Sequence, residues 1–199
     1  LFDKVRTSEI DQALVLSARE KIEKEPNYSF VAGRLVLNNL YKEVFKEGVD
    51  SDVFDLQYRK TFILNTKRLV KSGRFNKELL SFDLKKLSEN LKLERDKDFK
   101  YLGIQILYDR YFTREDGKVM EAPQCFWMRV AMGLAINEQN KNEKAIEFYN
   151  LLSRFLYTSS TPTLFNSGTS HSQLSSCYLN TFDDSIDGIF DGAWQEARK

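Results

Sequence analysis

The sequence predicts a mainly α-helical fold. Apolar residues recur every three or four positions as far as Phe155, which is the period of a helix with one buried face. Proline, glycine and asparagine interrupt this pattern where helices are expected to start or stop. With 42% hydrophobic and 13% aromatic residues, the 199-residue chain can form one large or two small domains with a sizeable core.

The first helix is expected to start at Thr7-Ser8 and to end before Pro26, because proline disfavours helical geometry in the residue that precedes it. Ser8 and Asp11 are predicted to form a capping box at its start. The predicted apolar stripe of this helix consists of Ile10, Leu14, Ala18 and Ile22.

A second helix follows, with Gly48 as its stop, and a third is predicted from Asp52 to Val70, closed by Ser72-Gly73. The second helix is expected to bury Val31, Leu35, Leu37, Leu40 and Val44. Shorter helical pieces are predicted over Asn76–Ser81 and Asp83–Leu91. The charged run Leu91–Lys100 (LKLERDKDFK) is interpreted as a solvated connection.

A further helix is predicted from Phe99 to about Arg110, followed by a hairpin that turns at Asp116-Gly117. The expected strands of the hairpin are Tyr111-Phe112 and Val119-Met120. Pro123 is predicted to open the next helix, because proline suits a first helical turn. Asn142 is the predicted cap of the helix after it, whose buried side should carry Ala145, Phe148, Tyr149, Leu152 and Phe155.

The pattern changes after Phe155. Thr158–Thr169 (TSSTPTLFNSGT) shows no helical period and predicts a loop. Leu174–Phe182 (LSSCYLNTF) alternates weakly, as expected of a strand, and Asp183-Asp184-Ser185 predicts the start of a last helix.

Composition excludes several classes of function. Thirty basic and 29 acidic side chains give a net charge of +1, so nothing indicates binding to nucleic acid. No window approaches the roughly 18 consecutive apolar residues of a membrane span. The two cysteines favour a reducing cytoplasm over a secreted, disulfide-rich domain. His171 is the one histidine and is expected to be exposed, and no ligand spacing indicates a metal site.

The residues most suited to chemistry lie near the end of the chain. Ser159, Ser160, Thr161 and Thr163 offer hydroxyls and N–H groups that could bind phosphate, and Thr161 is expected to be extended because Pro162 follows it. Ser176-Cys177 places a thiol beside a hydroxyl on the predicted strand. A Ser/Thr-rich loop leading into a core strand is the alternative interpretation. Cys125, among apolar helix residues, is predicted to be a buried, inert thiol.

The same stretch resembles a known family. STPTLFNSGT at Ser160–Thr169, followed by QLSSCYL at Gln173–Leu179, is similar to the opening of the catalytic barrel in the large subunit of ribonucleotide reductases of class I. Three earlier segments are similar to the family's helical domain: YLGIQILYDRYF (Tyr101–Phe112), PQCFWMRVAMGLA (Pro123–Ala135) and AIEFYNLLS (Ala145–Ser153). The RTSEI segment and Tyr28–Lys42 resemble the second half of its regulatory ATP cone.

The resemblance implies three parts. Residues 1–48 would be the C-terminal part of an ATP-cone-like domain, and residues 49–156 the helical N-terminal domain of the large subunit. Residues 157–199 would start the ten-stranded α/β barrel with its first strand. The glycine- and lysine-containing first strand segment of the cone has no counterpart, so only half a cone site is expected.

The resemblance also implies roles for individual residues. Thr161 and Ser176 would contact the substrate, and Cys177 would be one of two thiols that reduce the ribose and then form a disulfide. The start of the effector site that sets substrate choice would be Asp184, Ser185 and Ile186. Thr7 and Lys42 would contact a nucleotide in the cone. The radical cysteine and the disulfide partner of Cys177 have no counterpart in this sequence.

The implied partners follow from that family. They are the rest of the large subunit, a second large subunit, a small subunit that generates the radical at a diiron centre, thioredoxin or glutaredoxin, and ribonucleoside diphosphates. ATP and deoxynucleotides would be effectors, and this chain itself would hold no metal or cofactor. A relative with cobalamin as its radical source is an alternative.

Leu1 in place of Met and the helix-like run up to Lys199 lead us to expect a piece of a longer protein, inactive alone. The missing part would lie on the same polypeptide or on a second chain of a split subunit. A hypothesis of another class is a non-catalytic module that binds nucleotide or a partner and regulates an intact reductase.

Overall fold

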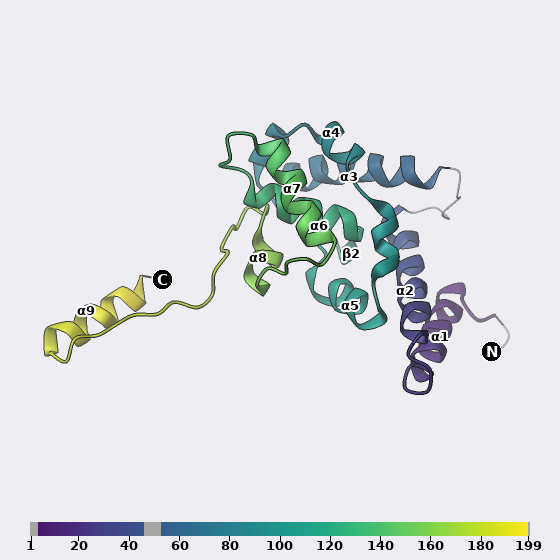
Figure 1. Cartoon of the computed structure of the whole chain (residues 1–199), viewed down its shortest axis with the longest axis horizontal. Helices are drawn as coiled ribbons and strands as arrows, with labels where there is room; N and C mark the ends of the chain where they lie inside the picture. The colour runs from purple at the N-terminus through teal and green to yellow at the C-terminus, as the bar shows by residue number, and fades with distance from the viewer. Residues whose placement is uncertain (1–3, 46–52, 199) are drawn as a thin grey trace.

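The computed structural model describes residues 4–45 and 53–198, and it confirms the mainly α-helical prediction (Figure 1). Gly48 and Asp52, the predicted stop and start of two helices, lie outside the described residues. The elements are α1 (Thr7–Glu20), α2 (Tyr28–Phe45), α3 (Phe54–Lys71), η1 (Lys77–Ser81), α4 (Leu84–Glu89), η2 (Leu93–Asp98), α5 (Tyr101–Ile106), η3 (Leu107–Tyr111), β1 (Arg114–Glu115), β2 (Lys118–Val119), α6 (Pro123–Leu134), α7 (Lys141–Ser153), α8 (Thr161–Asn166) and α9 (Ile186–Ala197).

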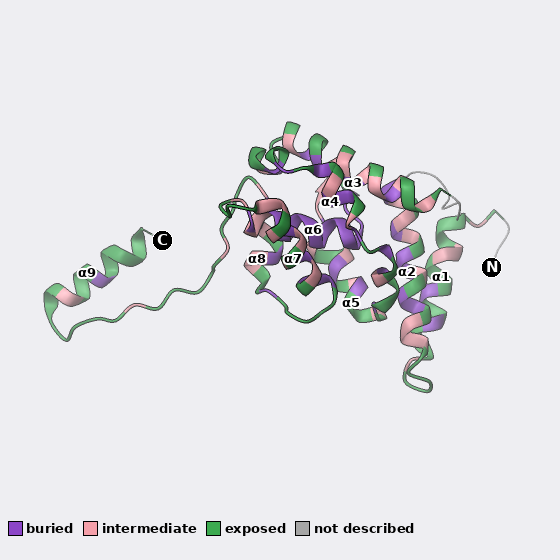
Figure 2. Ribbon diagram, turned by 45° about the horizontal axis from the view of Figure 1, so that its top comes forward, coloured by how far each residue is buried: buried purple, intermediate pink, exposed green. Residues whose placement is uncertain are grey.

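Helix α6 forms the centre of the core. Every residue from Pro123 to Met132 is buried, because α6 is surrounded on all sides, and Figure 2 shows it in the buried colour. Pro123 stands in the first turn, as predicted, where its missing N–H has no helical partner to lose. Helix α7 packs beside α6, and apolar residues from Val15 to Leu164 join one continuous core.

A buried carboxylate corrects the interpretation of Leu91–Lys100. This run forms η2, and Asp96 within it is only 1% exposed. The hydroxyls of Tyr41 and Tyr58 donate to Asp96 Oδ2 at 2.6 and 2.9 Å, and Gln124 Nε2 donates to Oδ1 at 2.7 Å. Burial raises the pKa of Asp96 to about 6, although these three hydrogen bonds act in the opposite direction. The hydrogen bonds of Asp96 therefore connect η2 to α2, α3 and α6.

Helix α1 begins as predicted but is capped differently. Its N-cap is Arg6, whose backbone N–H donates to Glu9 Oε2 at 2.8 Å, so the predicted Ser8–Asp11 box is wrong. The buried face of α1 carries Val15 and Ala18, whereas Leu14 of the predicted stripe is 49% exposed. Among the described elements, α1 packs mainly against α2, so a narrow buried face suffices.

Helix α2 packs between α1 and α5. Leu37, Leu40 and Val44 are buried as predicted, whereas Val31 is 45% exposed. A side chain at Gly33 would place its Cβ 2.8 Å from the carbonyl oxygen of Phe99, so α2 approaches this backbone closely.

The hairpin turns where predicted, at Asp116 (φ 51°) and Gly117 (φ 78°), both in the left-handed region that such a turn requires. Its first strand is Arg114–Glu115 instead of Tyr111-Phe112, because η3 continues the preceding helix through Tyr111. Arg114 pairs with Val119 and Glu115 with Lys118.

Helix α7 starts after Asn140, so the predicted cap at Asn142 is wrong. Asn142 Oδ1 instead accepts a hydrogen bond from the backbone N–H of Asp83 and ties α7 to the start of α4. Ala145, Tyr149 and Leu152 are buried as predicted, but Phe155 lies beyond the helix end and is 45% exposed.

The last part of the chain leaves this body. After Gln173 the backbone runs outward to α9, which stands apart from the other helices in Figure 1. The strand predicted over 174–182 is not formed within the described residues, since a strand requires a neighbour with which to exchange hydrogen bonds. No helix among the described residues is long and apolar enough to cross a membrane.

Candidate functional site

Thr161 stands at the first position of α8, a short helix inside the segment for which a loop was predicted. Pro162 occupies the first turn, where the absence of its N–H costs nothing. The extended residue is therefore Ser160 (φ −64°, ψ 158°) and not Thr161, which corrects that expectation. The Thr161 side chain is exposed, and its Oγ1 lies 3.1 Å from the hydroxyl oxygen of Tyr111.

A buried ion pair fixes the other end of α8. Arg129 Nε lies 2.8 Å from Glu121 Oε1, and their side chains are 2% and 4% exposed. The same guanidinium donates to the carbonyl oxygens of Leu164 and Ser167 at 3.3 and 2.6 Å. A guanidinium has five donors and no acceptor, so one carboxylate and several carbonyls can satisfy it together. Arg129 thereby joins α6 to the last turn of α8.

The contact between α6 and the end of α8 is a backbone-to-backbone approach. A Cβ at Gly133 would collide with the backbone N of Gly168, and Gly168 itself has φ +77°. Ser167 Oγ donates to the carbonyl oxygen of Val130 at 2.8 Å. These glycines are required because no side chain fits at this contact.

Two hydrogen bonds tie α8 to the outgoing segment. Asn166 Nδ2 donates to the carbonyl oxygen of Gln173 at 2.6 Å, and Thr163 Oγ1 donates to that of Leu174 at 3.2 Å. Three residues later the Cys177 thiol is exposed, with Ser176 Oγ 3.8 Å from its sulfur. Within the part of the chain that the structure describes, no interaction joins Cys177 to Thr161. The two residues are connected through α8, whose Thr163 and Asn166 side chains bind the carbonyl oxygens of Leu174 and Gln173.

The other cysteine is buried in α6, as predicted. Burial raises the pKa of the Cys125 thiol well above its usual range, and the charges of Glu121 and Asp96 act in the same direction. Such a thiol stays protonated and inert. His171 is exposed, also as predicted.

The predicted effector residues open α9. Ser185 is the N-cap, and its Oγ accepts from the N–H of Gly188 at 3.0 Å, which confirms the predicted helix start. Asp184 is exposed, and Ile186 is 74% exposed. The preceding chain folds back along α9, because Asn180 Nδ2 donates to Glu196 Oε1 at 2.7 Å.

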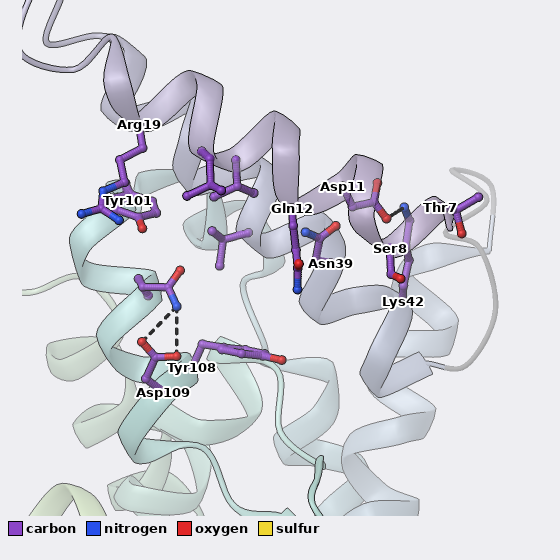
Figure 3. Close-up of a pocket in the computed structure, with 14 residues that line it drawn as sticks. Thr7, Ser8, Asp11, Gln12, Arg19, Asn39, Lys42, Tyr101, Tyr108 and Asp109 are labelled. Atoms are coloured by element: carbon purple, nitrogen blue, oxygen red, sulfur yellow. Dashed lines mark hydrogen bonds and ion pairs between the residues drawn. The ribbon is translucent and has the colours of Figure 1, made fainter. Parts of the chain in front are cut away.

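Thr7 and Lys42, the predicted cone residues, line one groove between α1, α2 and α5 (Figure 3). The groove has a volume of about 940 Å³. Its apolar lining residues include Val15, Leu16 and Val36, and its polar lining residues include Gln12, Arg19, Asn39, Tyr101, Gln105 and Asp109. Lys42 Nζ lies 2.7 Å from Asp11 Oδ2, so this cation is already paired. A groove lined by both apolar and polar side chains suits an organic ligand.

Among residues 4–45 and 53–198, no group of three or more acidic, cysteine or histidine side chains could hold a metal ion. Tyr111, Glu121 and Arg129 were not predicted as part of the site. The hydrogen bonds that join Tyr111 and Arg129 to α8 span 35 to 50 positions, and a charged residue eight positions from another, as in the Arg129–Glu121 pair, gives little local signal.

Comparison with known proteins gives a consistent assignment. Residues 97–172 match the family model described as "Ribonucleotide reductase, all-alpha domain". A "Ribonucleoside-diphosphate reductase subunit alpha" of Chlamydia muridarum (strain MoPn / Nigg) is 50% identical over 190 residues, which are 94% of this chain and 18% of the relative. A protein of the same name from Helicobacter pylori (strain ATCC 700392 / 26695) is 43% identical over 192 residues.

The similarity extends to vertebrates. A "Ribonucleoside-diphosphate reductase large subunit" of Danio rerio is 35% identical over 192 residues, 96% of this chain and 24% of the relative. The chain thus spans about a fifth of the length of these curated relatives. Nearly all of its own length is matched, and α5 to α8 lie within the all-alpha domain match. Over nearly its whole length the chain is therefore similar to part of the large subunit of ribonucleotide reductases.

Proposed function

We propose that this chain supplies the N-terminal part of the large subunit of a class I ribonucleoside-diphosphate reductase, which reduces ribonucleoside diphosphates to deoxyribonucleoside diphosphates. The observation that carries the proposal is the exposed Cys177, on a segment anchored to α8 only three residues before it. An exposed thiol on a short tether beside a hydroxyl-rich helix suits a reductant of a bound sugar phosphate.

In this proposal Thr161 and Ser176 donate hydrogen bonds to the substrate, since both hydroxyls are exposed. Cys177 supplies one of two thiols. The two thiols lose two electrons and two protons and become a disulfide, while the ribose carbon is reduced and its hydroxyl leaves as water. Cys125 is the other cysteine of the chain and is buried in α6, so the second thiol has to come from the remaining part of the subunit.

We assign Asp184, Ser185 and Ile186 to the start of a deoxynucleotide effector site at a large-subunit dimer interface. Helix α9 exposes Ile189, Phe190 and Trp194 at 57%, 70% and 60%. Apolar side chains at this density favour a protein partner.

The further partners in the proposal are a small subunit with a diiron radical source, and thioredoxin or glutaredoxin as reductant. Two free cysteines fit a cytoplasmic location.

The test is thiol mapping in the assembled enzyme, with this chain joined to the rest of the large subunit on the same or a second polypeptide. After turnover without external reductant, we expect Cys177 in a disulfide and Cys125 free. Cys177→Ser should abolish product formation, and Cys125→Ser, the matched control, should leave it intact. A Cys177 that stays reduced after turnover would refute the proposal.

A second candidate function is nucleotide binding by a regulatory module. The observation that favours it is that Thr7 and Lys42 line the same groove. Calorimetry with ATP and dATP should show binding that weakens in Lys42→Ala and persists in Lys67→Ala, a lysine exposed on α3. Absence of heat at millimolar nucleotide would exclude this function for the chain.

A further inference from the structure

Among the described residues, one side chain is within hydrogen-bond distance of the Thr161 hydroxyl, and it is the hydroxyl of Tyr111. Tyr111 ends η3, a π-helical turn that continues α5. A π turn shifts the residues after it relative to a regular helix, and such turns are frequent at functional sites. Here the shift places a phenol beside the first residue of α8, 50 positions further along the chain.

The ring of Tyr111 is held independently of its hydroxyl. It stacks on Phe165 of α8, with ring centroids 4.5 Å apart and planes inclined by 19°, and it meets the edge of Phe126 at 6.4 Å. The far end of α8 is fixed by Arg129. The Tyr111 hydroxyl therefore reaches Thr161 from a ring that is already positioned by its contacts with Phe165 and Phe126.

Hydrogen-bond capacity then fixes the direction of the contact. A threonine hydroxyl has one proton and two lone pairs, and the ionised oxygens of a diphosphate only accept. When Thr161 donates to a diphosphate, its oxygen is free to accept from Tyr111, and Tyr111 becomes the donor. Each bond in such a chain strengthens the next.

We propose that Tyr111 is a positioning residue for substrate binding: its hydroxyl orients the Thr161 hydroxyl toward the diphosphate. This inference rests on the proposed function, because it takes Thr161 as a substrate contact. Tyr111 acts through Thr161 and does not touch the reacting atoms.

The experiment measures kcat and KM for a ribonucleoside diphosphate in the assembled enzyme. Tyr111→Phe keeps the stacked ring and removes only the hydroxyl. We expect KM to rise about threefold to tenfold with kcat nearly unchanged, the effect of one lost hydrogen bond. Thr161→Val should raise KM further. Adding Tyr111→Phe to Thr161→Val should then change nothing more, because the two hydroxyls act as one unit.

The matched control is Tyr28→Phe. Tyr28 is also half-buried, and its ring contact with Lys21 survives the change. It should leave KM unaltered, and thermal unfolding of each variant checks that the fold is retained. If Thr161→Val raises KM but Tyr111→Phe does not, or if the two effects multiply, the positioning role is wrong and the proposed function stands. If Thr161→Val itself leaves KM unchanged, Thr161 is not a substrate contact and both fall.

Discussion

The helical body and the C-terminal segment 173–198 use large apolar side chains in opposite ways. In the body, Phe126 is fully buried and contacts the rings of Tyr111, Phe112 and Trp127. In the segment, Leu179 is 100% exposed and Phe190 70%. The body is thus stabilised by burial of its own apolar surface, whereas the segment leaves large apolar side chains in contact with solvent. The part of the molecule closest to the proposed chemistry is therefore the part that this chain alone stabilises least.

The two cysteines give the largest expected contrast. Cys177 should react with iodoacetamide at the rate of an open thiol, and Cys125 at least about a thousandfold more slowly, because α6 has to open first. Peptide mass spectrometry after timed labelling measures both rates. The Cys177→Ser chain should retain only the slow reaction. Equal rates at the two sites would show that the body is open as well.

Truncating a phenylalanine tests where the stability resides. Phe126→Ala should lower the free energy of unfolding by about 3–5 kcal/mol, because it removes a fully buried ring and leaves a cavity. Phe190→Ala, the same change in α9, should lower it by less than about 0.5 kcal/mol in the isolated chain. Urea unfolding followed by far-UV circular dichroism compares the two. A large loss in Phe190→Ala would mean that α9 packs on the body.

The buried carboxylate gives the body a dependence on pH. The pKa of Asp96 is 3.8 in an ordinary setting and about 6 in the folded chain. The folded state therefore binds the proton more tightly, and this contribution to stability is complete below pH ~4 and is lost as pH rises through ~6. A pKa difference of about 2 units corresponds to about 3 kcal/mol at most. Unfolding curves between pH 4 and 7 should show the decline, and Asp96→Asn should flatten it.

The helix caps give the smallest contrast. Asp83→Ala removes the acceptor for the N–H of Lys86 at the start of α4 and should cost about 1 kcal/mol of global stability. Ser185→Ala removes the corresponding bond in α9 and should reduce only the helix content of the segment. Circular dichroism at 222 nm and urea midpoints separate the two effects. A shifted urea midpoint in Ser185→Ala would contradict the separation.

The body was predictable from the sequence wherever a local pattern determines the element. The apolar period gave α2, α3 and α6, Asp116-Gly117 gave the turn of the hairpin, and Ser185 gave the start of α9. Asp96 was misplaced because its burial depends on Tyr41, Tyr58 and Gln124, which lie 28 to 55 positions away. Nothing within LKLERDKDFK distinguishes this carboxylate from its solvated neighbours.

The candidate site was predictable in composition but not in shape. The hydroxyl cluster around Thr161 and the thiol of Cys177 were predicted as functional groups. The short helix that carries Thr161 was not predicted. Pro162 led to the prediction that Thr161 is extended, although at the second position of a helix proline replaces an N–H that would have no partner. Tyr111 was missed because it was predicted to be part of a hairpin strand, and nothing in its local sequence indicates a partner 50 positions further on.

The hydrogen-bonded carbonyls of Gln173 and Leu174 are the fixed end of a short tether that carries Cys177. Three residues of fully extended chain reach at most about 10 Å, so Cys177 sweeps a small volume around the end of α8. The local concentration of its thiol there depends on the length of that tether and not on the protein concentration. Lengthening the chain between Leu174 and Ser176 would dilute the thiol without altering a single contact in the body.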